Sequence, residues 1–134
     1  MMKSLLKSSG RGSRYGQHTL GELHKFGEAG LAKDYAQAVA FWQLAAAQGL
    51  DGAQDILGNM YQDGWGVAQD LAEALRWYQL AAAQGNPAAL YNIAACYEDG
   101  DGVRKNKSAA IRWYRRAQAA GDRDAAADLR MLGV

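Results

Sequence analysis

The sequence predicts an all-α protein made of stacked antiparallel helix pairs, with three repeats followed by a C-terminal capping helix. The main observation is internal similarity: the stretch WYQLAAAQG at 77–85 has a close copy, FWQLAAAQG, at 41–49 and a looser copy, WYRRAQAAG, at 113–121. The copies begin 36 residues apart, and a fixed period of this length is typical of helical repeat proteins. Abundant alanine and a single proline among 134 residues also favour helices over strands.

The first unit, expected at residues 15–50, follows the pattern loosely. Leu20 and His24 fit its first helix, and His24 stands where the other units have tyrosine, so we interpret it as a core replacement. One extra residue precedes Asp34, the predicted cap of the second helix. Residues 1–14 carry four bases and no acid, and we expect a flexible basic tail there, without the apolar stretch that a secretory signal needs.

The second unit, residues 51–86, is the clearest. Leu57 and Tyr61 lie four residues apart and so share one side of its first helix. The second helix begins at Asp70, and Glu73 follows three residues later, which is the spacing of a capping box. Small residues after Leu57 and its equivalents leave room for a neighbouring helix. These small residues are Gly21, Gly58 and Ala94.

The third unit, residues 87–122, and the capping segment, residues 123–134, show the same signals. Gly85 closes the preceding helix, and the next helices are expected to be capped by Asn86, Asn106 and Asp122. The capping helix is expected at 124–132, where Arg130 occupies the small position and would prevent a further unit from stacking.

One aromatic ring per unit is predicted to lie between the helix layers. These rings are Phe41, Trp77 and Trp113. The lone cysteine, Cys96, precedes the core residue Tyr97 and is interpreted as a small buried hydrophobe. Because a single cysteine cannot form an intramolecular disulfide, and no apolar run is long enough to span a membrane, we expect a cytoplasmic protein.

Charge is distributed unevenly along the chain, although the net charge is only +1. Residues 15–103 hold eleven acids against three bases, and residues 104–134 hold eight bases against three acids. The small net charge argues against nucleic-acid binding. Three bases that share a helix side, Arg112, Arg115 and Arg116, lie beside aromatics expected in the core. The polarity fits self-association better, with the basic end of one copy meeting the acidic middle of another.

Residues for catalysis are scarce. Four of the five serines lie in the tail, and the chain has one threonine. His18 and His24 are six residues apart and do not share a helix side. A nucleophile, a base and an orienting group are not brought together, so we predict no catalytic, cofactor or metal site.

The pattern L-G-x-x-Y-x-x-G-x-G-V-x-x-D-x-x-x-A-x-x-W-Y-x-x-A-A-x-x-G, complete at Leu57–Gly85, resembles the Sel-one-like repeat, a relative of the tetratricopeptide repeat. The resemblance implies a right-handed α-solenoid whose first helices line a concave groove. It also implies a non-enzymatic adaptor that binds another protein. An inhibitor or immunity-type protein for one enzyme or toxin is the first alternative. A hydrolase, as among the cysteine-rich members of the family, is a weaker one.

Transfer of the groove positions from the tetratricopeptide repeat gives candidate partner-binding residues. These are Tyr15, His18, Glu22 and Lys25 in unit one, Asp55, Asn59, Gln62 and Asp63 in unit two, and Tyr91, Ala95, Glu98 and Asp99 in unit three. Five acids and one lysine predict a cationic partner segment, although an ordinary solvated helix side has the same composition. Trp65, between two glycines, is a further candidate anchor, unless it folds over its own helix pair.

Overall fold

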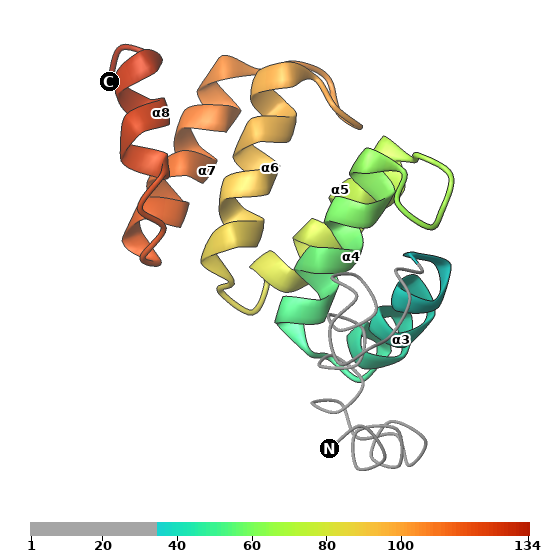
Figure 1. Cartoon of the computed structure of the whole chain (residues 1–134). Helices are drawn as coiled ribbons and strands as arrows, with labels where there is room; N and C mark the ends of the chain where they lie inside the picture. The colour runs from blue at the N-terminus through green and yellow to red at the C-terminus, as the bar shows by residue number, and fades with distance from the viewer. Residues whose placement is uncertain (1–34) are drawn as a thin grey trace.

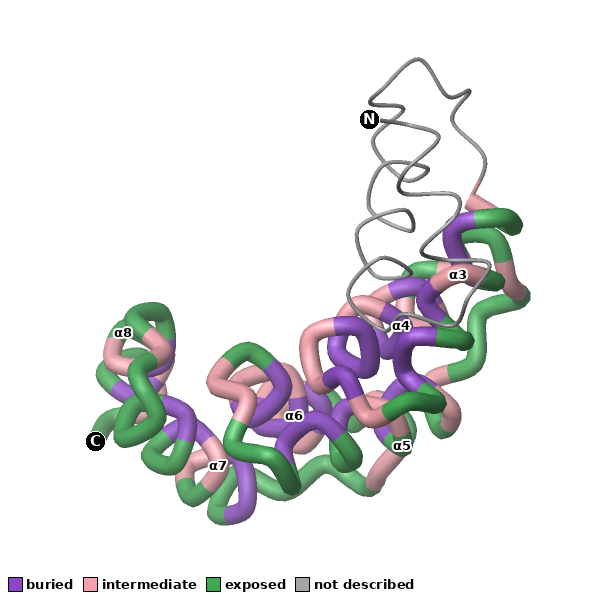
Figure 2. Tube along the Cα trace, turned by 90° about the horizontal axis from the view of Figure 1, so that it is seen from below, coloured by how far each residue is buried: buried purple, intermediate pink, exposed green. Residues whose placement is uncertain are grey.

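The computed structural model describes residues 35–134, which form six α-helices and no strand (Figure 1). The helices are α3 Tyr35–Ala47, α4 Asp51–Asp63, α5 Leu71–Ala82, α6 Pro87–Asp99, α7 Lys107–Ala119 and α8 Ala125–Met131. Figure 2 shows these helices in an arc, with α4, α6 and α8 on its inner side and α5 and α7 on its outer side. The predicted all-α solenoid is confirmed. The expectations for residues 1–34, including Tyr15, His18, Glu22, Lys25 and His24, lie outside the described residues.

Side-chain caps begin the helices where the sequence predicts them. The Asn86 and Asn106 carboxamide oxygens accept hydrogen bonds from the N–H groups of Ala89 and Ala109 at 2.9 and 3.0 Å. In α8, Asp122 accepts from the N–H groups of Asp124 and Ala125 at 2.9 and 3.0 Å. These bonds satisfy donors that have no partner inside a helix.

The capping box predicted at the start of α5 is only half formed. The Asp70 carboxylate accepts the N–H of Glu73 at 3.0 Å, as expected. Glu73 does not return the bond, because the N–H of Asp70 donates to the carbonyl of Tyr61 at 2.9 Å. The Glu73 carboxylate pairs with Arg76 instead. The hydrogen bond from Asp70 to Tyr61 of α4 therefore replaces the capping-box bond from Asp70 to Glu73.

The prediction of the buried rings is wrong by one position. Phe41, Trp77 and Trp113 are half-buried, and the wholly buried ring of each unit is the next residue along. These buried rings are Trp42, Tyr78 and Tyr114. One residue turns the side chain by about 100° around the helix, so only one of two adjacent aromatics faces the core. Trp77 and Trp113 pack at the edge of the two hydrophobic clusters.

Three glycines allow a side chain or the backbone of a neighbouring element to approach closely. A Cβ on Gly58 would lie 2.5 Å from the ring of Tyr78, which confirms the predicted close approach. Gly66 and Gly102 have φ of +75° and +73°, and a Cβ on them would overlap the carbonyl groups of Tyr35 and Leu71. Both contacts join the loop of one unit to the first turn of the preceding unit's second helix. The stacking of units is therefore set partly by backbone against backbone.

Candidate protein-binding face

Two equivalent hydrogen bonds join successive inner helices. The Asn92 side-chain N–H of α6 donates to Asp55 of α4 at 2.9 Å. One repeat later, the Tyr91 hydroxyl of α6 donates to Asp128 of α8 at 2.6 Å. The partners are 37 residues apart in both pairs. The predicted site residues Asp55 and Tyr91 therefore connect one repeat to the next.

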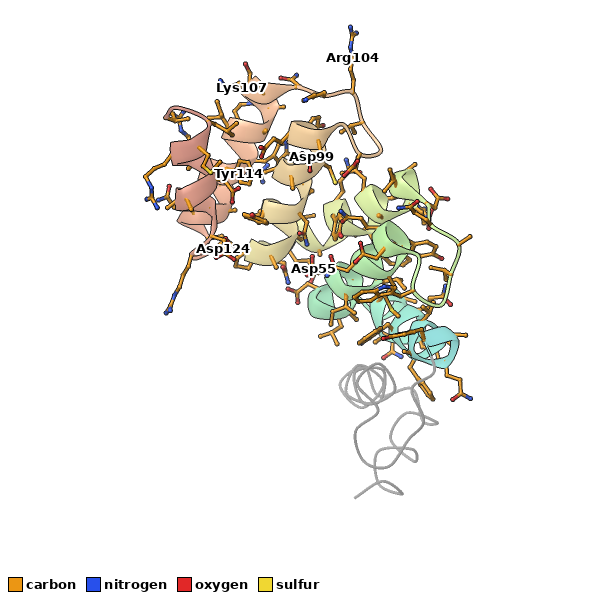
Figure 3. All side chains as sticks on the ribbon, turned by 45° about the horizontal axis from the view of Figure 1, so that its top comes forward. Asp55, Asp99, Arg104, Lys107, Tyr114 and Asp124 are labelled. Atoms are coloured by element: carbon orange, nitrogen blue, oxygen red, sulfur yellow. The ribbon has the colours of Figure 1, made fainter. Side chains whose placement is uncertain are left out.

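Asp55 is a carboxylate held between two helices (Figure 3). Only 8% of the residue is exposed. Burial raises the pKa of Asp55 from 3.8 to about 6, partly opposed by the bond from Asn92 and reinforced by the nearby carboxylate of Asp51. Asp51 itself accepts from the side chain of Asn86 at 2.9 Å. This part of the predicted face is a buried polar seam between units two and three.

Buried tyrosines hold three further candidates in place. The Tyr78 hydroxyl lies 2.6 Å from both Asn59 Oδ1 and Gln62 Oε1. One repeat later, the Tyr114 hydroxyl donates to Glu98 at 2.6 Å, and Glu98 occupies the position of Gln62. Burial raises the pKa of both phenols, and the bond to Glu98 raises that of Tyr114 further. Asn59, Gln62 and Glu98 thus connect the two helices of their own units.

Asp63 and Asp99 are the candidates most open to solvent. They are the last residues of α4 and α6, and both are exposed. Glu98 and Asp99 border a surface hollow of about 290 Å³, whose other lining residues are Lys105, Lys107 and Leu132. Figure 3 shows Asp99 near the end of α6 that faces the start of α7. Two lysines therefore reduce the negative charge beside Asp99. The helix that ends at Asp63, α4, contains no lysine.

The remaining candidates occupy different surroundings. Trp65 is 37% exposed and stacks on Tyr35 at 5.7 Å between ring centroids, with 26° between the planes. Since Tyr35 begins α3, the indole packs against the preceding unit and not over its own helix pair. Ala95 is half-buried. The sequence interpretation missed Asn92 and Asp128, and the spacing of 37 residues was the available signal.

The carboxylates of α4 and α6 lie on one side of their helices. We call this set the acidic face, and it consists of Asp51, Asp55, Asp63, Glu98 and Asp99. Glu98 and Asp99 occupy the repeat positions of Gln62 and Asp63. At 100° per residue, the five carboxylates then fall within about 120° of the circumference of one helix. Neither helix contains lysine, arginine or histidine. The arrangement attracts cations but has no base of its own within α4 or α6.

The described residues offer little for catalysis. Residues 35–134 contain one serine, Ser108, which is exposed, and they contain neither threonine nor histidine. Cys96 is buried, as predicted, and burial raises its thiol pKa to about 11. Within this part of the chain no three His, Cys, Asp or Glu side chains are grouped to hold a metal ion. Its helices are also too short or too polar to cross a membrane.

A second hollow, of about 280 Å³, lies between α7 and α8. It is lined by Arg115, Gln118, Ala126, Leu129, Arg130 and Val134. Its charged lining is basic, in contrast to α4 and α6. The C-terminal end of the described chain is therefore basic where the middle, at α4 and α6, is acidic.

Similarity to known proteins agrees with this architecture. Solved structures of several proteins resemble the chain, and the two of higher identity that follow are longer proteins. A protective antigen of uropathogenic Escherichia coli with an SLR fold is 37% identical, with a TM-score of 0.87 over 90% of this chain and 26% of that one. A Sel1 repeat protein from Oxalobacter formigenes is 34% identical, with a TM-score of 0.87 over 96% and 52%. Cysteine rich protein B of Helicobacter pylori, at 20% identity and a TM-score of 0.73 over 96% and 91%, shows the fold alone.

No curated protein matches the chain. The family model for the Sel1 repeat matches it three times, at residues 14–50, 52–86 and 87–122. The chain therefore belongs to the Sel1 repeat family.

Proposed function

We propose that this protein is a non-enzymatic scaffold that binds a cationic segment of a partner protein along the acidic face. Sel1 repeat proteins are commonly scaffolds for protein–protein interaction. The observation that carries the finer proposal is the charge of the inner helices: α4 and α6 hold five carboxylates and no base. Complementary charge would govern the encounter rate and the choice of partner.

The candidate residues contribute to this proposal in two ways. Asp63, Asp99 and the half-buried Glu98 present charge to solvent, so they would contact the partner directly. Asp55 and Tyr91 are engaged in bonds between repeats, so they would fix the curvature of the face. Trp65 remains 37% exposed beside Tyr35 and would add an apolar contact.

The absence of catalysis is proposed from the chemistry of the side chains. Ser108 has no histidine in residues 35–134 to act as its base. The Cys96 thiol stays protonated at neutral pH because its pKa is raised, and the thiolate is the nucleophilic form. Both properties support a binding role over a hydrolytic one.

A peptide array tests the proposal. Cationic, neutral and acidic peptides of equal length are presented to the purified chain at low and high salt. We expect the cationic peptides to be retained at low salt and to lose binding at high salt, because exposed charges are screened. The variant Asp63→Lys with Asp99→Lys should lose this binding by at least about tenfold.

The control is Asp124→Lys, matched to the single variant Asp63→Lys, because each reverses one exposed carboxylate, at the start of α8 and at the end of α4 respectively. It should bind the cationic peptides nearly as well as the native chain. Equal retention of neutral and cationic peptides, or unchanged binding by the double variant, would show that the acidic face does not select the partner. Affinity capture with mass spectrometry then separates two roles: one stoichiometric partner indicates an inhibitor, and several indicate an adaptor.

A further inference from the structure

One side of α7 is basic in a way that the repeat does not require. Arg112, Arg115 and Arg116 are all exposed. At 100° per residue they lie within about 100° of each other and opposite the buried side of the helix. We call this set the arginine face. Figure 2 shows α7 on the outer side of the arc.

The other repeats serve as internal controls for these positions. The equivalent residues are Arg76, Gln79 and Leu80 in α5, and Ala40, Gln43 and Leu44 in α3. All three helices adopt the same fold with these different side chains. Folding alone therefore does not explain three arginines in the third repeat.

The arginine face is also without compensating charge. Helix α7 contains four bases and no acid. Within residues 35–134 none of the three arginines forms an ion pair, and Arg116 instead stacks on the half-buried ring of Trp113 at 4.3 Å. Like charges three and four residues apart in a helix repel one another. An anionic partner would remove this repulsion.

The same chain carries a surface of opposite charge. Residues 35–103 contain eight acids and one base, whereas residues 104–134 contain eight bases and three acids. The acidic face lies on inner helices and the arginine face on an outer helix (Figure 2). The arginine face of one copy is therefore opposite in charge to the acidic face of another, and the two faces lie on different helix layers.

We propose that the protein self-associates, with the arginine face of one copy docked on the acidic face of a second copy. This inference rests on the proposed function, since it uses the same acidic face and names one occupant for it. The contact joins two different surfaces. Each pair thus leaves one acidic face and one arginine face unoccupied, so further copies can add in the same direction. The assembly is held by exposed charges and is expected to dissociate as salt rises.

Sedimentation velocity of the full chain tests the inference. At low salt the weight-average mass should rise with protein concentration, and at high salt it should approach that of one copy. The variant Arg112→Glu with Arg115→Glu, and the variant Asp63→Lys with Asp99→Lys, should each remain monomeric alone. In the first variant two of the three arginines become glutamates, and in the second the two exposed carboxylates of the acidic face become lysines. Neither variant alone therefore keeps a pair of complementary exposed faces.

Mixing the two variants in equal amounts is the decisive measurement. Each variant keeps the face that the other has lost, so the intact acidic face of the first can dock on the intact arginine face of the second. Pairs of the two variants should therefore form with an affinity within about threefold of the native contact. Arg123→Glu with Arg130→Glu is the control, because it removes the same charge outside the arginine face. It should associate nearly as the native chain does. Circular dichroism of every variant verifies that the helices are intact.

Three results would overturn the inference: a native chain that stays monomeric at low salt, variants that associate as the native chain does, or a mixture that fails to associate. A monomeric native chain whose acidic face still binds cationic peptides would leave the proposed function standing. Binding of a labelled oligonucleotide tests the competing explanation, that the arginine face binds nucleic acid. If it binds the native monomer and is lost in the Arg112→Glu, Arg115→Glu variant, the arginine face serves nucleic acid and the inference is wrong.

Discussion

Asp55→Asn is expected to make this protein more stable at neutral pH. Asp55 is a buried carboxylate, and the charge of a nearby carboxylate, Asp51, disfavours its ionised form further. Asparagine has nearly the same shape, and its carbonyl oxygen still accepts the bond from Asn92. The substitution therefore removes a desolvated charge and keeps the contact between repeats. Removing an uncompensated buried charge is favourable when the space stays filled.

The magnitude follows from the pKa of Asp55, which rises from 3.8 to about 6 on folding. Each unit corresponds to about 1.4 kcal/mol, so the ionised carboxylate costs the folded chain about 3 kcal/mol. The folded state binds the proton more tightly than the unfolded state does. Asp55 therefore stabilises the fold below about pH 4, and this contribution is lost as the pH rises through about 6.

Urea unfolding followed by circular dichroism measures the effect. The free energy of unfolding of the native chain should include a gain from Asp55 of about 1.4 kcal/mol between about pH 7.5 and pH 5.0. Asp55→Asn should lack this gain and be up to about 3 kcal/mol more stable at the higher pH. Asp63→Asn removes a charge from an exposed position of the same helix and controls for net charge. Identical pH dependence in the native chain and Asp55→Asn would refute the reasoning.

Three further outcomes are expected. Gly66→Ala should lower the unfolding free energy by more than about 2 kcal/mol, because the added methyl meets the Tyr35 carbonyl. Gly85→Ala is the control, since Gly85 has φ of +83° but open space around it, and it should cost only about 1 kcal/mol. Equal losses of unfolding free energy in urea titrations would contradict the packing argument. Tyr78→Phe leaves two amide oxygens without the buried hydroxyl and should cost about 1–3 kcal/mol, measured by thermal unfolding against the native chain. Cys96 should react with a thiol reagent only after unfolding, since its pKa is raised to about 11, and rapid labelling of the folded chain at neutral pH would show that the thiol is open to solvent.

Much of the fold can be predicted from the sequence because the same signals occur at the same positions of successive repeats. The caps at Asn86, Asn106 and Asp122 are local contacts within three residues, so spacing alone predicts them. The small residue at Gly58 marks a close approach that the period places against the next helix. Signals of this kind depend only on neighbours in the chain or on the position within the repeat.

The errors concern contacts that the period does not determine. Two adjacent aromatics occur in each unit, and the pattern does not say which one faces the core; the structure buries Tyr78 and leaves Trp77 at the edge. From the sequence alone, Asp55 is expected to be a solvated acid of the groove. Its partner Asn92 could not be found from the repeat, because the other units have a different residue at that position. The exposure of a polar residue depends on the neighbouring unit, and this neighbour lies 37 positions away.

The contacts of Gly66 and Gly102 with main-chain carbonyls have a consequence for how such a scaffold can change. Because atoms common to every amino acid set the distance between successive layers there, substitutions at the exposed positions of the inner helices can alter what is recognised without altering the pitch of the array. New specificities can therefore be installed at Asp63 or Asp99 while both glycines are retained. Replacing either glycine would instead shift every later repeat relative to the earlier ones and displace all binding positions together.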